Sequence, residues 1–178
     1  MIDDEYQGGE TVADNPAATE EARPDFDRLI GVVTDGLIGA LGGAVGTAVL
    51  TVGLLIAASL GAFDTARFAV VAELLGAELV FDSNIASIGY LVFLLGGMTV
   101  WPLLLASIGS FLPGDRFALK GIPLGMAIWT GFAPAFYGGE SGVALVLFLV
   151  ITFFAHVFYG FTLGAVFDYF SNRPDTLV

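Results

Sequence analysis

Four long stretches of this 178-residue chain carry no charged side chain. They cover residues 36–63, 83–114, 121–139 and 141–167, and only His156 adds a titratable group to the last of them. An α-helix rises about 1.5 Å per residue and the hydrocarbon core of a bilayer is about 30 Å thick, so such stretches predict transmembrane helices. With 56% hydrophobic residues, the chain is expected to be an all-α integral membrane protein, a bundle of four transmembrane helices.

The expected transmembrane domain covers residues 29–178. Its spans are placed at about residues 36–63, 84–112, 121–138 and 142–167. Pro123 and Pro134 fall within the third span, which predicts a helix that is kinked or begins at Pro123.

The segment between the first two spans has an amphipathic pattern. Arg67, Glu73 and Glu78 are predicted to lie on one side of it, and apolar residues recur at helical spacing on the other: Phe68, Val71, Leu74, Leu75 and Leu79. This pattern predicts an interfacial amphipathic helix over residues 65–79.

Acidic residues dominate the parts of the chain that meet water. The formal net charge is −12, and residues 1–28 hold nine of the 18 acidic side chains without apolar periodicity. We expect these residues to form a disordered cytoplasmic tail. The scarcity of lysine and arginine argues against nucleic-acid binding, and the acidic composition indicates a halophilic organism. The absence of cysteine excludes disulfides and thiol nucleophiles, and with a single histidine it excludes zinc fingers.

The basic residues predict the orientation in the cell membrane. With four spans, five of the six would share one side and Arg67 would lie on the other. The five are Arg23, Arg28, Arg116, Lys120 and Arg173. Because cytoplasmic flanks retain lysine and arginine, both termini are expected to be cytoplasmic.

Glycines recur four residues apart in the first and fourth spans. The predicted packing faces consist of Gly39, Gly42, Gly43 and Gly46 in the first span and Gly160 and Gly164 in the fourth. Small residues let helix backbones approach closely in lipid. These faces could pack within the bundle or against a larger membrane partner.

A mid-membrane polar layer is expected around His156, the one ionisable side chain inside a span. Its other members are Thr47, Thr51, Thr99, Trp129, Thr152 and Tyr159. His156 could be a neutral imidazole that hydrogen-bonds a threonine, or an axial haem ligand opposite Met98, Met126 or a partner's side chain. A proton relay is disfavoured because no span contains a carboxylate.

Three sequence segments carry a family resemblance: residues 97–104 (GMTVWPLL), 111–114 (FLPG) and 155–164 (AHVFYGFTLG). They resemble a family of small, uncharacterised four-helix membrane proteins of haloarchaea, over residues 36–168. Members of that family are similar in kind to small subunits of haem–copper terminal oxidases.

The expected function is therefore that of a non-catalytic accessory subunit of a larger membrane complex, with a respiratory-chain terminal oxidase as the partner. The alternative is a small homo-oligomeric transporter or channel with its polar site around His156, which the prolines of the third span favour. Neither an enzymatic activity nor a bound cofactor or metal is expected, because the chain has no catalytic constellation and no nucleotide motif.

Overall fold

The computed structural model describes residues 26–81 and 83–171. Within these residues every regular element is helical, and the four long helices are α2 (Phe26–Ser59), α4 (Ile85–Ile108), α5 (Phe117–Phe136) and α6 (Gly142–Ser171). The chain divides into two compact units, residues 1–34 and 35–178, and the contacts described here belong to the second. Of the predicted tail over residues 1–28, the first 25 lie outside the described residues, and α2 begins at Phe26.

Three helices of the described part are long and apolar enough to cross a membrane. They are Val33–Ser59, Ile85–Ile108 and Gly142–Ser171. The prediction of an all-α membrane protein is confirmed, with three of the four predicted spans corresponding to helices that could cross a membrane. Helix α5 has 20 residues and is therefore about 30 Å long, but it contains Lys120 and two prolines and is not one of these three helices. It begins at Phe117 and contains both prolines, so it does not begin at Pro123 as the alternative prediction had it.

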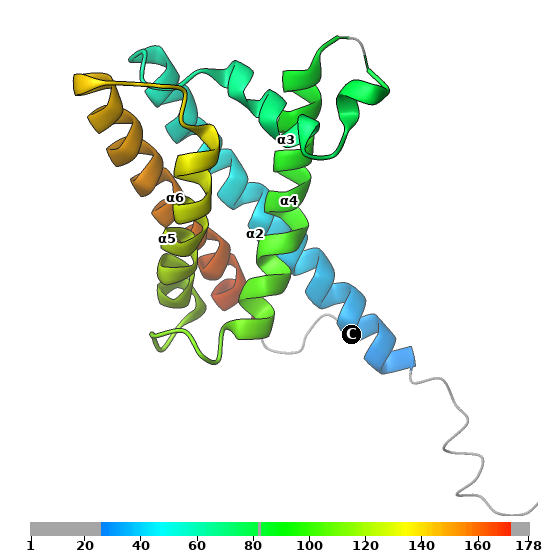
Figure 1. Cartoon of the computed structure of the whole chain (residues 1–178). Helices are drawn as coiled ribbons and strands as arrows, with labels where there is room; N and C mark the ends of the chain where they lie inside the picture. Colours follow the sequence, from blue (N-terminus) through cyan, green and yellow to red (C-terminus); the bar gives the residue numbers. More distant parts are fainter. Residues whose placement is uncertain (1–25, 82, 172–178) are drawn as a thin grey trace, which may run out of the picture. The chain divides into compact units, whose positions relative to one another are not determined.

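Helices α5 and α6 pack side by side (Figure 1), and glycines bring their backbones into direct contact. Gly121 lies against Gly160, and a Cβ atom added to either glycine would collide with the carbonyl oxygen of the other. Gly125 meets the carbonyl of His156 in the same way, and Gly164 meets that of Phe117. Glycine therefore sets the separation of the two helices, as it does in other membrane bundles.

The glycine face of α2 is buried against α4 and α6. Gly43 contacts the backbone of Gly97 and Met98, so that no Cβ fits there. Gly46 and Gly42 lie against Tyr159 and Leu163 of α6, and Gly39 faces Pro102 and Phe167. All six glycines predicted as packing residues thus contact helices of the same chain, which corresponds to the intramolecular alternative.

The segment between α2 and α4 differs from the predicted amphipathic helix. It consists of three short pieces: the 3₁₀ helix η2 (Thr65–Phe68), α3 (Ala69–Glu73) and the 3₁₀ helix η3 (Ala77–Leu79). Gly76 interrupts the helix with a φ of 69°, a left-handed conformation that glycine adopts at little cost. Phe68 and Ala72 are buried against Gly89 of α4, whereas three residues of the predicted apolar face are exposed: Leu74, Leu75 and Leu79.

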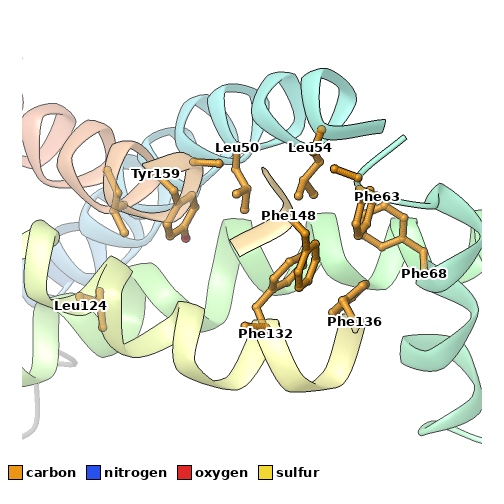
Figure 2. Close-up of a cluster of buried hydrophobic side chains, with 14 of the residues drawn as sticks. Leu50, Leu54, Phe63, Phe68, Leu124, Phe132, Phe136, Phe148 and Tyr159 are labelled. Atoms are coloured by element: carbon orange, nitrogen blue, oxygen red, sulfur yellow. The ribbon is translucent and has the colours of Figure 1, made fainter. Parts of the chain in front are cut away.

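Aromatic rings fill the core where this segment meets the long helices. Figure 2 shows Phe132 and Phe136 projecting from α5 toward Phe148, with Phe63 and Phe68 beside them. Phe132 and Phe136 stack with ring centroids 4.2 Å apart, and Phe63 lies parallel to Phe148 at 6.4 Å. This cluster closes the bundle on one side of His156, because the Phe132 ring also packs on the imidazole at 4.5 Å.

Candidate functional site

His156 is fully buried in the middle of α6, and its ring has a defined tautomer. Nδ1 lies 2.7 Å from the carbonyl oxygen of Thr152, one turn earlier. A carbonyl can only accept, so Nδ1 carries the proton and donates it. In the neutral imidazole, Nε2 is then a hydrogen-bond acceptor, and it has no partner among the described residues.

Thr152 joins α6 to α5. Its hydroxyl donates to the carbonyl of Phe148 over 2.6 Å and accepts from Nε1 of Trp129 at 3.0 Å. The indole N–H of a half-buried tryptophan is thereby satisfied inside an otherwise apolar helix contact.

Tyr159 joins α6 to α4. Its hydroxyl donates to the carbonyl of Gly97 at 2.7 Å, and the side chain is almost fully buried. Gly46 of α2 lies under the Tyr159 ring, where a Cβ atom would approach a ring carbon to 2.9 Å. A glycine of α2 and a carbonyl of α4 thus fix the position of this ring.

Thr47 of α2 completes the centre of the site. It is fully buried, and its hydroxyl oxygen lies so close to Gly97 that a Cβ there would collide with it. Like Nε2 of His156, the Thr47 hydroxyl has no hydrogen-bond partner among the described residues. Both residues line a cavity of about 10 Å³, together with Gly97 and Tyr159.

Five of the seven side chains predicted for the polar layer come together in this way: Thr47, Trp129, Thr152, His156 and Tyr159. Thr51 lies one turn further along α2, where its hydroxyl is 3.1 Å from the hydroxyl of Tyr90. Thr99 does not join the layer, because α4 turns this side chain outward and its hydroxyl donates to the carbonyl of Leu95. Sequence analysis did not identify Gly97 or Tyr90 as polar partners, and the sequence offers no signal for a backbone carbonyl such as that of Gly97.

The alternative of haem ligation by His156 does not fit this geometry. The cavity that His156 lines has a volume of about 10 Å³, far below that of a porphyrin. Phe132 covers the imidazole on one side, and Gly125 packs on the His156 backbone. Among the described residues, no three His, Cys, Asp or Glu side chains form a group that could hold a metal ion.

A larger hollow of about 440 Å³ lies where α2, η2 and α4 meet. Leu54 and Phe68 contribute apolar wall, and Thr51, Ser87 and Tyr90 contribute hydroxyls. None of its described lining residues is charged. Such a lining suits an apolar chain with a neutral hydrogen-bonding group.

Asp168 of α6 caps the beginning of α5. Its two carboxylate oxygens accept from the backbone N–H groups of Phe117 and Ala118 at 2.8 and 2.9 Å. A carboxylate satisfies free N–H groups and complements the positive end of the helix dipole at this position. The side chain therefore closes the α5–α6 pair at the end away from the connecting turn.

The fold and its centre define a helical membrane protein whose helices pack through glycine around a small, uncharged polar core. The chain belongs to the family of unknown function DUF6789, whose model matches residues 33–178. The expectation of an uncharacterised family is thereby confirmed, and the matched region contains α4, α5, α6 and α2 from residue 33 onward, but not the acidic tail. No match was found among curated proteins or among solved structures.

Proposed function

We propose that the protein is a non-catalytic accessory subunit of a larger membrane complex. The observation that carries this proposal is the outer face of α5, whose exposed residues between Ala127 and Ala135 are all small. The face comprises Ala127, Thr130, Gly131, Pro134 and Ala135, all of them exposed. A Cβ atom added at Gly131 would meet nothing within 4 Å.

Small residues are the main means by which helices attract each other in lipid, because their backbones can approach closely. The glycine faces of α2 and α6 are used inside the chain, so the small-residue face of α5 is the one left for a partner helix. Pro134 adds a reason for such a partner. It has no N–H to donate to the Thr130 carbonyl, and a polar backbone group is costly where it faces hydrocarbon.

We propose further that α5 crosses the membrane as a fourth span. Its length matches the bilayer core, and it runs along α6 through paired glycines. Four crossings would place Arg116, Lys120 and Arg173 on the side of the N-terminal tail and Arg67 opposite. We therefore propose that both termini are cytoplasmic, in the plasma membrane.

The partner we propose is a haem–copper terminal oxidase of a haloarchaeal respiratory chain. The partner class rests on the resemblance of residues 97–104, 111–114 and 155–164, and the haloarchaeal origin rests also on the acidic composition. Membrane lipid would cover the remaining outward faces of α2, α4 and α6, whose exposed side chains are mostly aliphatic or aromatic.

The test is purification of the tagged chain from a halophilic host at high salt in mild detergent, followed by mass spectrometry of what accompanies it. Stoichiometric oxidase subunits would support the proposal, and a homogeneous self-oligomer would contradict it. Gly131→Leu should release the partner, because the added side chain fills the contact without touching the rest of this chain. Gly36→Leu is the matched control, since Gly36 is also exposed and has nothing within 4 Å of an added Cβ.

The second candidate is a small homo-oligomeric transporter with His156 in its path. It is favoured by the two unpartnered polar atoms at the centre of the bundle, the hydroxyl of Thr47 and Nε2 of His156. This candidate predicts solute flux into proteoliposomes that His156→Ala changes while the oligomer persists. Flux that is absent from the wild-type protein would dismiss it.

A further inference from the structure

The hydroxyl of Thr47 and Nε2 of His156 are two buried polar atoms without a hydrogen-bond partner among the described residues, and both residues line the same cavity. Both side chains are 0% exposed. A buried polar group without a hydrogen bond is costly, so nearly all such groups in proteins are paired with protein or with ordered water.

The two atoms are complementary. Nδ1 of His156 is the donor to Thr152, so Nε2 offers a lone pair. Helical threonines and serines usually donate to a carbonyl of the preceding turn, as Thr99, Ser107 and Thr152 do in this chain. Thr47 makes no such bond, so its hydroxyl proton is free to point into the cavity.

The cavity has the size of one water molecule. Its volume of about 10 Å³ is about the minimum that a cavity needs to hold one water molecule, and it has no room for a larger ligand. Its remaining wall is largely apolar, with Leu50, Phe93 and Ile128 among the lining residues. Tyr159 also lines it, and the Tyr159 hydroxyl oxygen can still accept after donating to Gly97.

We propose that this cavity is a binding site for one water molecule, which accepts from the Thr47 hydroxyl and donates to Nε2 of His156. The water connects α2 to α6 through the side chains of Thr47 and His156. It complements the Tyr159–Gly97 bond between α6 and α4 and the Trp129–Thr152 bond between α5 and α6. The proposal is independent of the partner of the complex and of any transport.

The chain has a single histidine, so nuclear magnetic resonance can observe this site without ambiguity. The full-length protein, labelled with ¹⁵N and ¹³C in histidine and deuterated elsewhere, would be studied in detergent micelles. We expect a protonated Nδ1, an unprotonated Nε2 whose ¹⁵N shift is that of a hydrogen-bonded acceptor, and a cross-peak from a long-lived water to the ring carbon protons beside Nε2.

Two variants identify the source of that cross-peak. Thr47→Val removes the donor at nearly constant volume and should move the Nε2 shift toward that of a free acceptor, with loss of most of the water cross-peak. Thr51→Val is the matched control on the same helix, because the Thr51 hydroxyl bonds Tyr90 and does not line the cavity. It should leave the histidine spectrum unchanged.

The wild-type spectrum tests the proposal even where a variant fails to fold. The absence of a water cross-peak in the folded wild-type protein would overturn it. A shift of Nε2 on Thr47→Val with no water cross-peak in the wild type would overturn it too, since it would indicate a direct bond between threonine and histidine.

Discussion

The Tyr159 hydroxyl donates to the backbone carbonyl of Gly97 across 2.7 Å, and this bond joins α6 to α4 in the interior of the bundle. The contact depends on glycine, because α2 approaches the same region through Gly43, which touches the Gly97 backbone, and Gly46, which lies under the tyrosine ring. The position of the Tyr159 side chain thus depends on the close approach of α2, α4 and α6.

Tyr159→Phe should destabilise the protein without changing its packing. The ring and its contact with Gly46 would remain, and only the bond to Gly97 would be lost. Hydrogen bonds between membrane helices contribute about 0.6–1.7 kcal/mol each, so we expect a loss of that order in the free energy of unfolding. Denaturation of the detergent-solubilised protein, followed by circular dichroism, would measure it. Tyr137→Phe is the control, because the Tyr137 hydroxyl bonds Glu140 in an exposed turn and its loss should have a smaller effect.

Gly160→Ala should disrupt the α5–α6 contact. The new methyl group would collide with the carbonyl of Gly121, a backbone atom that cannot rotate away, and the two helices would have to separate. Overpacking of this kind typically costs about 1–3 kcal/mol. Gly96→Ala makes the same change in α4 at a position with nothing within 4 Å, and should change the unfolding free energy by less than about 1 kcal/mol. Equal losses in the two variants would mean that the contact of Gly160 with Gly121 has no special weight.

Asp168→Ala should loosen the first turn of α5. The variant loses both acceptors for the N–H groups of Phe117 and Ala118, and the loss of a helix cap costs about 0.5–2 kcal/mol. Asp168→Asn keeps one oxygen acceptor and should lose less. Hydrogen exchange at Phe117 and Ala118 would report the change locally, with Asp115→Ala in the exposed preceding loop as the control. Unchanged exchange in Asp168→Ala would show that the cap contributes nothing.

The helices could be located from the sequence because charged side chains are excluded from the bilayer core. The predicted span over residues 84–112 overlaps α4, and the one over 142–167 overlaps α6. Glycine spacing also indicated the correct faces, since backbone contact requires small residues whatever surrounds them. Five of the seven polar-layer residues followed from their depth in the spans.

The rotation of each helix about its axis was harder to predict. Lipid is as apolar as a protein core, so hydrophobic residues occur on all sides of α4 and do not distinguish inside from outside. Thr99 was placed in the polar layer from its depth in the span, and the structure shows it exposed. The prediction of one amphipathic helix over residues 65–79 was wrong for another reason. Gly76 has a left-handed conformation that interrupts the helix, so Leu79 does not share a face with Phe68.

The number of crossings can be decided by chemical labelling, because the chain has no cysteine of its own. Ser110 and Ser141 are exposed and flank α5 on its two sides, so Ser110→Cys and Ser141→Cys are conservative probes. If α5 crosses the membrane, the two positions lie on opposite faces. We expect an impermeant maleimide to label Cys at position 141 in intact cells, and Cys at position 110 only after the membrane is opened.

Ser83→Cys serves as the reference for the outer face, because residue 83 lies between α2 and α4, two helices that are apolar enough to span. With four crossings, positions 83 and 141 should react alike. With three crossings, α5 would stay on one side of the membrane, and position 141 would show the same accessibility to the maleimide as position 110. That second pattern would place the two termini on opposite sides of the membrane and would remove the argument that a partner helix covers α5 within the bilayer.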